Sequence, residues 1–509
     1  MQKLRILFLG GLLALPSAAF GAEFKLASVF GNHMVLQREK PVAIWGWADP
    51  AEPVQVQFGT QRKKTTADSE GRWTLLLDSM PASAEPRTLT ATGSGERTAT
   101  VADVLVGEVW LGSGQSNMAF SVREARDFPT EQSKAQFPLI RVYKETSRTA
   151  TTAQPNGSGA WSVCSPETVG QFSAVLYFFG REIHSHLEGI PVGLLNSSVG
   201  GTRIEWWIPA EAQTVDEETK ASYDKALREF QEFDPSQAPV LFEKQKAIWR
   251  AAAEKAKAND EFPPYPPKDP LMLYQLKGGP AGLFNGKIAN LVPFTLRGIL
   301  WYQGEGNASN GALYRKQLTA LVTSWRALWR EELPFAWVQL PNYHNKGEGW
   351  PLVRESMREC LSLPNTGMAI AIDLGEKHEI HPPNKQDVGK RLSLWALSQV
   401  YHQPITPYSG PLIQSAEVVS GAVRLRFQHT GTHLQTTNQS PLTGFELSSA
   451  DGVWKNAEAR IENDLVVLSS TEIPQPVAAR YAWAAWPNAN LCNSANLPAA
   501  PFRISLTPP

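Results

Sequence analysis

The sequence has few of the residues that define disulfide-rich, metal-binding or nucleic-acid-binding proteins. It contains 3 Cys among 509 residues, at positions 164, 360 and 492. So sparse and odd a set excludes a disulfide framework and allows one bridge at most. No Cys and His cluster has the spacing of a zinc site, so we expect neither a metal nor a cofactor. The formal net charge is −1, with no basic stripe, and we expect no nucleic-acid partner.

Long hydrophobic runs are also missing, apart from one near the start of the chain. Residues 6–15 are apolar, follow Lys3 and Arg5, and precede small residues that include Ala19 and Gly21. This pattern predicts a signal peptide over residues 1–22, and its apolar part is too short to span a bilayer comfortably. We therefore expect an exported bacterial protein, periplasmic or secreted, with no stable membrane insertion.

The length implies more than one domain, and the residue pattern changes twice along the chain. Short alternating strands predict an N-terminal β-sandwich domain over 23–104 and a C-terminal β domain over 405–509. Between them, over 105–404, strands alternate with helices, which predicts an α/β domain with a mostly parallel sheet. Its candidate elements are strands at 296–302, 335–340 and 368–374 and helices at 312–330 and 386–400.

A charged segment at about 211–277 interrupts the α/β pattern. It is helix-forming and then Pro-rich at 263–267. We interpret it as a helical insertion. It either covers one side of a cleft or is a solvated helix pair with no function.

The motif Gly-Gln-Ser-Asn-Met at 114–118 follows the apolar run 104–112. A buried strand that runs into a Gly-rich turn would present Ser116 beside backbone N–H groups, as a nucleophilic serine requires. Met118 stands where the second Gly of a Gly-x-Ser-x-Gly elbow would be, so the motif is not that elbow. A lone serine in such a turn is commonly only a turn residue. Whether Ser116 is a nucleophile therefore depends on a base and oxyanion donors elsewhere in the chain.

A general base for this serine is offered by His381, between a predicted strand and a predicted helix. Pro382 and Pro383 stiffen its loop, and a histidine near its ordinary pKa suits proton transfer at neutral pH. His378 and His344 are competing candidates for the same role.

Donors for an oxyanion are available in two further loops. Gly200 and Gly201 lie in the turn after one predicted strand, where paired glycines let backbone N–H groups approach a ligand. Gln303 and Asn307 offer side-chain amides after another predicted strand. All these loops follow strands of one α/β domain, which brings them to the same edge of a sheet.

These motifs together resemble the sialate O-acetylesterase family of SGNH hydrolases, which includes bacterial acetylesterases that act on plant polysaccharides. The resemblance covers nearly the whole chain after residue 22, except 211–277. The motifs that carry it are Gly-Gln-Ser-Asn-Met at 114–118, Gly-Gly-Thr-x-Ile-Glu at 200–205, Trp-Tyr-Gln-Gly-Glu at 301–305 and Ile-His-Pro-x-Asn-Lys at 380–385, with further matches at 30–38, 282–288, 481–483, 488–491 and 501–503.

The resemblance implies an SGNH-like three-layer α/β domain with a parallel sheet, flanked by sandwich-like β domains. It also implies Ser116 as nucleophile and His381 as base. The implied oxyanion hole consists of the Ser116 N–H, an N–H of Gly200 or Gly201, and the Gln303 amide, with Asn307 as the less favoured donor.

The acid that orients His381 departs from the family pattern. Many relatives have Asp two residues before the histidine and related SGNH enzymes have it three before, whereas this chain has Glu379 and His378 there. We predict Glu379. Glu376 and Asp373 are alternatives, as is a Ser–His dyad supported by a carbonyl. Glu305 is expected to anchor the loops by hydrogen bonds.

The predicted function is therefore a metal-independent carbohydrate O-acetylesterase whose substrate is acetylated sialic acid or a sugar from plant polysaccharide. Arg203, Trp206 and Trp207 follow the Gly-Gly turn and are candidates for binding the sugar, although the two tryptophans could equally pack the domain. The alternatives are a non-catalytic glycan-binding protein and an SGNH esterase or lipase for longer acyl chains. The sequence leaves the oligomeric state open.

Overall fold

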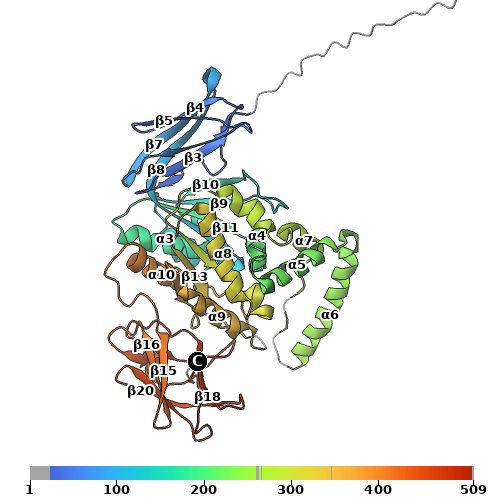
Figure 1. Ribbon diagram of the computed structural model, residues 1–509, viewed down its shortest axis with the longest axis vertical. Coiled ribbons are helices and arrows are strands. Elements are labelled where there is room, and N and C mark those ends of the chain that lie inside the picture. The colour runs from blue at the N-terminus through green and yellow to red at the C-terminus, as the bar shows by residue number, and fades with distance from the viewer. Residues whose placement is uncertain (1–22, 260–262, 265, 345–346, 507–509) are drawn as a thin grey trace, which may run out of the picture.

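A computed structural model describes residues 23–259, 263–264, 266–344 and 347–506 of the chain. The predicted signal peptide, residues 1–22, lies outside the described residues. Figure 1 shows the N-terminal strands, the central α/β region and the C-terminal strands following one another along the long axis of the molecule.

The N-terminal strands form two sheets, because their residues alternate between buried and exposed sides. In β4 and β6 every second residue is buried, and their apolar side chains enter a shared core that includes Ile44 and Trp73. One sheet has the order β1-β3-β6, and in the other β4 pairs with β5 and β7 while β7 and β2 pair with β8. The strands are β1 (Lys25–Leu26), β2 (Val35–Gln37), β3 (Val42–Trp47), β4 (Pro53–Phe58), β5 (Gln61–Thr66), β6 (Arg72–Leu77), β7 (Ser83–Thr92) and β8 (Thr98–Gly114).

Strand β8 joins the N-terminal strands to the central sheet. Its first part pairs with β7 and β2, and its second part pairs with β11 and β12. The division that we expected between residues 104 and 105 therefore falls inside a continuous strand. Residues 104–114 are all buried, as expected for a strand covered on both faces.

The central sheet has the strand order β10-β9-β11-β8-β12-β13-β14. All neighbours in it are parallel except β10, which pairs antiparallel with β9 at the edge, so the sheet is mixed rather than purely parallel. Its remaining strands are β9 (Ile140–Glu145), β10 (Gly159–Val163), β11 (Val192–Ser198), β12 (Gly298–Tyr302), β13 (Phe335–Gln339) and β14 (Thr366–Ile370).

Helices cover both faces of this sheet, because its strands are apolar on both sides. Leu300 and Val338 pack against one set of helices, and Ile299 and Trp337, their strand neighbours, pack against the other. The region is therefore a three-layer α/β/α structure. Helices α3 (Ala174–His186) and α10 (Lys385–Trp395) lie on the first face, and α8 (Tyr314–Trp329) and α9 (Gly349–Glu359) lie on the second.

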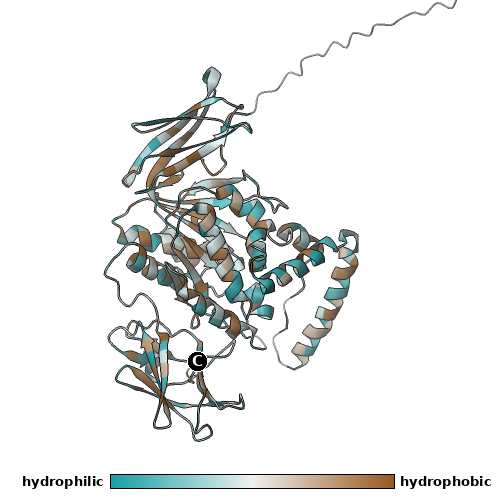
Figure 2. Cartoon of the chain, in the orientation of Figure 1, coloured by the Kyte–Doolittle hydropathy of each residue, from teal (hydrophilic) through white to brown (hydrophobic). Residues whose placement is uncertain are grey.

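Further helices lie close to the sheet or stand away from it. The predicted helical insertion contains helices that project to one side of the central region in Figure 1, and Figure 2 shows hydrophilic and hydrophobic residues mixed along them. The projecting helices are α5 (Glu217–Gln231), α6 (Ala238–Ala258) and α7 (Pro270–Lys277). The short helices α1 (Ser116–Ala119), α2 (Phe128–Ser133) and α4 (Ala210–Gln213) belong to the central region.

The C-terminal strands form two four-stranded sheets and one strand pair. The orders are β15-β16-β21-β20, β19-β18-β22-β24 and β17-β23, all with antiparallel neighbours. The strands are β15 (Leu412–Val419), β16 (Ala422–Gln428), β17 (Leu434–Thr436), β18 (Phe445–Ser448), β19 (Trp454–Asn456), β20 (Glu458–Glu462), β21 (Leu465–Ser469), β22 (Ala478–Tyr481), β23 (Leu491–Asn493) and β24 (Phe502–Ser505).

Cys164, Cys360 and Cys492 are buried and unpaired. Within the described ranges, no helix combines the length and the apolarity needed to cross a bilayer.

Candidate active site

Three loops meet at the carboxyl edge of the central sheet because the strands that carry them end in register. Gly114, the last residue of β8, is paired with Ser198 of β11 on one side and with Tyr302 of β12 on the other. The chain segments that follow are those of Ser116, of Gly200 and of Gln303. In a parallel sheet this edge is the usual place for a site.

The turn that presents Ser116 depends on Gly114. This residue has φ +138°, and a Cβ on it would stand 2.1 Å from the carbonyl oxygen of Tyr302, so a side chain does not fit there. The N–H of Gln115 then donates to the same carbonyl (3.0 Å), and α1 begins at Ser116. Ser116 is half-buried at the start of this helix, with its hydroxyl at the edge of the sheet.

A hydrogen-bonded chain runs from Ser116 through His381 to Glu379. Nε2 of His381 lies 2.8 Å from Oγ of Ser116, and Nδ1 lies 3.1 Å from Oε1 of Glu379. The backbone N–H of His381 donates to the same Glu379 oxygen (2.8 Å), which fixes the loop between the two residues. A hydroxyl, an imidazole and a carboxylate in this order have the geometry of a serine-hydrolase triad.

The surroundings of His381 favour its neutral form. Burial lowers the pKa of its imidazole, the nearby charge of Glu379 opposes that shift, and the Lys385 ammonium adds to it. The ring is stacked against Phe120, with 6.3 Å between centroids. A neutral imidazole held between a hydroxyl and a carboxylate can accept a proton from the hydroxyl.

The competing candidates have other contacts or are exposed. Both carboxylate oxygens of Asp373 accept hydrogen bonds from the guanidinium of Arg391, at 2.6 and 2.7 Å. Glu376 is exposed. The rings of His344 and His378 contact each other edge to face at 6.0 Å. Glu379, by contrast, is hydrogen-bonded to the His381 ring.

Gly200 lies directly against Ser116. A Cβ on Gly200 would stand 3.3 Å from Cβ of Ser116 and 4.0 Å from its backbone nitrogen. Within the described part of the chain, neither the N–H of Ser116 nor that of Gly200 donates to a backbone acceptor. Backbone N–H groups on two segments in such contact can serve an oxyanion. Gly201 follows with φ +71°, a conformation that favours glycine.

The two side-chain amides predicted for the oxyanion hole are committed to other partners. Gln303 is 0% exposed, and its Nε2 donates to Gln115, to the Thr202 carbonyl and to Asn307. Asn307 is 3% exposed, and its Nδ2 donates to Glu205 (3.0 Å) and Gln317 (3.3 Å). Neither amide has a hydrogen left for an oxyanion. In this structure both side chains hold the loops together, and their role as oxyanion donors stays a prediction.

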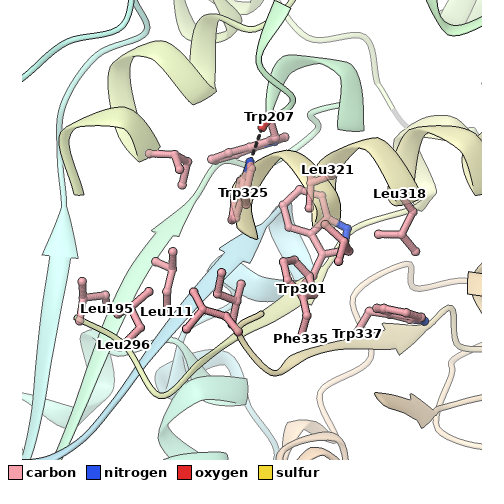
Figure 3. Close-up of a cluster of buried hydrophobic side chains, with 14 of the residues drawn as sticks. Leu111, Leu195, Trp207, Leu296, Trp301, Leu318, Leu321, Trp325, Phe335 and Trp337 are labelled. Carbon is pink, nitrogen blue, oxygen red and sulfur yellow. Dashed lines mark hydrogen bonds between the residues drawn. The ribbon is translucent and has the colours of Figure 1, made fainter. Parts of the chain in front are cut away.

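Trp207 takes the packing role, which we considered beside sugar binding. It is 0% exposed, its indole N–H donates to Thr202 Oγ1 (3.0 Å), and its carbonyl accepts from the Trp325 indole (3.0 Å). Figure 3 shows it packed within the hydrophobic cluster around Trp301 and Trp325. Trp207 therefore packs the domain, while Arg203 and Trp206 both line a surface cavity.

A buried polar network beneath the loops includes Glu305, which we expected to anchor them, and also Lys385 and Asn117, which were missing from the sequence interpretation. Lys385 donates to Oδ1 of Asn117 (2.6 Å) and to the Pro382 carbonyl (2.8 Å), and Asn117 donates to Glu305. Burial lowers the pKa of the Lys385 ammonium to about 7 and raises that of the Glu305 carboxyl. The network connects the serine loop, the histidine loop and the loop after β12. All three residues lie inside the sequence motifs quoted above, and their place in those motifs was the feature that could have indicated the network.

Metal-ligating side chains do not gather at this edge. Over the ranges that the structure describes, no group of three or more His, Cys, Asp or Glu residues is placed to hold an ion. The chemistry available from the described residues is that of a hydroxyl nucleophile with a neutral base and two backbone donors.

Comparison with known proteins gives the family. The family model described as "Carbohydrate esterase, sialic acid-specific acetylesterase" matches residues 106–249 and 285–397, just over half of the chain. The chain belongs to this family. Carbohydrate O-acetylesterase activity follows from that membership.

Individual relatives agree over nearly the full length. The chain is similar to the sialate O-acetylesterase of Rattus norvegicus, with 30% identity over 97% of each chain, and to that of Mus musculus, with 29% identity over 96% of each. Among solved structures it is similar to a carbohydrate acetylesterase from Xanthomonas citri, with 33% identity, a TM-score of 0.79 and coverage of 94% of this chain and 99% of that one.

Proposed function

We propose that this acetylesterase uses a Ser–His mechanism through an acetyl-enzyme on an SGNH-like α/β domain. The observation that carries the proposal is the 2.8 Å separation between Oγ of Ser116 and Nε2 of His381. Glu379, 3.1 Å from the other ring nitrogen, holds the imidazole in the required tautomer and stabilises its charged form.

In the first half of the reaction, Oγ of Ser116 attacks the acetyl carbonyl carbon while His381 takes the hydroxyl proton. The negative charge on the carbonyl oxygen is stabilised by the N–H groups of Ser116 and Gly200, with Gly201 in the same turn; one such donor typically contributes about 3 kcal/mol. The bond between the acyl carbon and the sugar oxygen then breaks, and His381 gives its proton to that oxygen.

In the second half, His381 takes a proton from water, and the hydroxyl oxygen attacks the acetyl carbon of the acyl-enzyme. The bond to Oγ breaks, Ser116 recovers its proton, and acetate leaves. The substrate is an O-acetylated sugar, from sialic acid or from plant polysaccharide. Export to the periplasm or the medium is also part of this proposal and rests on the pattern of residues 1–22.

Acetate release tests the function directly. We expect the purified protein to release acetate from 4-nitrophenyl acetate and from at least one acetylated carbohydrate, with rates unchanged by a chelator because no step requires a metal. A protein that hydrolyses 4-nitrophenyl octanoate faster than the acetate would contradict the carbohydrate reaction and favour a long-chain esterase.

The pH dependence of kcat/KM tests the role of His381. The neutral imidazole accepts the proton, so the rate rises with pH through the pKa of His381 and is constant above it. Burial lowers this pKa, so the midpoint is expected below the ordinary value of about 6.5. In Glu379→Gln the negative charge that opposes the shift is gone, so the midpoint moves to still lower pH.

The plateau of the same profile is also expected to fall in Glu379→Gln, by about tenfold or more, but by less than the roughly 10⁴-fold typical of a buried triad carboxylate. The reason is that half of the Glu379 side chain is exposed to solvent. Glu376→Gln removes a carboxylate from the same loop and is the matched control. If the plateau of kcat/KM fell in Glu376→Gln and not in Glu379→Gln, the choice of Glu379 as the acid would be contradicted.

A further inference from the structure

A cavity of about 240 Å³ lies between the chain that follows Gly201 and the inserted helices α5 and α7. Its lining includes Arg203 and Trp206 from the first segment and Phe230, Phe233 and Tyr274 from the second. Arg203 comes two residues after Gly201, so the cavity begins beside the turn that carries the proposed oxyanion donors. Its volume is close to the lower end of the roughly 300–1,000 Å³ typical of small-molecule sites.

The lining of the cavity is largely aromatic. The ring of Tyr274 is stacked on that of Phe230 with 4.6 Å between centroids, and on that of Phe233 with 4.7 Å. These side chains are half-buried, so part of each remains available to a ligand. Tyr274 thus lies between the two phenylalanines and holds them in place, and the outer face of such a ring suits the C–H face of a pyranose ring.

Polar groups stand beside this aromatic lining. The exposed Arg203 guanidinium lies 3.8 Å from the Glu205 carboxylate, and Glu229 also lines the cavity. Nζ of Lys268 lies 3.5 Å from the position of a Cβ on Gly201, so this ammonium is at the turn itself. Planar donors and acceptors next to an aromatic surface match the hydroxyl groups at the edge of a sugar ring, whereas a hydrocarbon chain has no use for them.

The segment that completes the cavity lies outside the family match. The matched ranges stop at residue 249 and resume at 285, so Lys268 and Tyr274 belong to a part of the chain that the family model does not cover. Such a segment is suited to setting which substrate this chain accepts, while the reaction itself depends on the matched loops.

We propose that this cavity is a leaving-group subsite that binds a second sugar ring, so that the enzyme acts on O-acetylated oligosaccharides in preference to single acetylated sugars. The inference rests on the acetylesterase function proposed above. The acetylated ring lies at Ser116, and the next ring of the glycan lies in the cavity against Phe233 and the edge of Tyr274.

Kinetics on paired substrates test the subsite. Acetylated methyl xyloside is compared with acetylated xylotriose, acetylated methyl sialoside with acetylated sialyllactose, and 4-nitrophenyl acetate is the small reference ester. For the pair that the wild type hydrolyses, Tyr274→Ala and Phe233→Ala are expected to raise KM for the oligosaccharide about tenfold, as for the loss of one aromatic contact. They leave the methyl glycoside and 4-nitrophenyl acetate unchanged.

Two further variants are matched controls. Phe242→Ala removes an aromatic ring from α6 of the same insertion, where Phe242 lies 4.7 Å from Nζ of Lys246, and is expected to change nothing. Tyr274→Phe keeps the stacked ring and is expected to retain the low KM. The thermal midpoint of each variant shows whether it is folded.

Three outcomes would overturn the subsite. An equal loss on all esters would make Tyr274 and Phe233 structural. A loss on 4-nitrophenyl octanoate with glycans unaffected would make the cavity an acyl-chain pocket. The third outcome comes from calorimetry with acetyl-free xylotriose and sialyllactose. These sugars would bind the wild type and Tyr274→Ala with equal affinity, or would bind neither protein. A wild type inactive on every ester would instead contradict the proposed function, and the calorimetry would still decide the subsite.

Discussion

Replacing Ser116 with alanine is expected to lower the rate of acetate release by about 10⁴-fold or more while the protein stays folded. The hydroxyl is the atom that forms the acetyl-enzyme, and in serine hydrolases its loss removes the covalent route and leaves the smaller contribution of the oxyanion hole. Among the hydrogen bonds of the described residues, the Ser116 hydroxyl makes the 2.8 Å contact with Nε2 of His381. Its removal is therefore expected to leave the packing of the domain intact.

The measurement is acetate release from 4-nitrophenyl acetate and an acetylated carbohydrate by both proteins, with circular dichroism as the folding control. Mass spectrometry of the wild type mixed rapidly with substrate adds a direct readout, because an acetyl group should appear on the peptide that contains Ser116. A folded Ser116→Ala protein with wild-type turnover would contradict the mechanism.

Replacing His381 with alanine is expected to lower kcat by about 10³-fold to 10⁶-fold. Without the imidazole, no group takes the serine proton or returns it to the sugar oxygen. The double variant with Ser116→Ala is expected to be no worse than the more impaired single variant, because residues that act as one unit are not additive.

Two other histidines near this loop are the controls. His344→Ala and His378→Ala remove the rings that contact each other at 6.0 Å. We expect both variants to retain most of the activity. If His378→Ala were as inactive as His381→Ala, the assignment of the base would have to be revised.

The local pattern of the chain was sufficient to predict the layers of the central region. The apolar runs that we assigned to strands at 296–302 and 335–340 correspond to β12 and β13, and the helix expected at 312–330 corresponds to α8. The reason is that strands covered on both faces must be apolar throughout, whereas a helix on a sheet has one apolar stripe. The antiparallel edge strand β10 has no such signature.

The motifs predicted the two central residues of the site but not the partners of every side chain. Ser116 and His381 stand in turns after strands, where a sequence pattern carries information about position. Gln303 and Asn307 stand in an equally suggestive loop, yet their amides bond to neighbouring loops. A one-dimensional pattern gives the place of an amide but not the direction in which it donates.

For aromatic residues too, the sequence indicated the position but not the neighbours of each side chain. Trp207 follows the Gly-Gly turn and was a reasonable candidate for sugar binding, but it lies in the core against Trp325. Phe230 and Tyr274, 44 residues apart in the chain, received no role from the sequence. They stack on each other because α5 and α7 fold back to the same side of the sheet.

By itself, the sequence determined the family and the alternation of strands and helices, and it supplied the proposal for the serine and the base, because these depend on local spacing and on short motifs. The tertiary structure decided which groups share a space: Glu379 against the His381 ring, Asp373 on Arg391, Gly200 against Ser116, and the cavity under the insertion. The physical reason is that hydrogen-bond direction and burial depend on neighbours distant in the chain, and only the packed strands and helices bring those neighbours together.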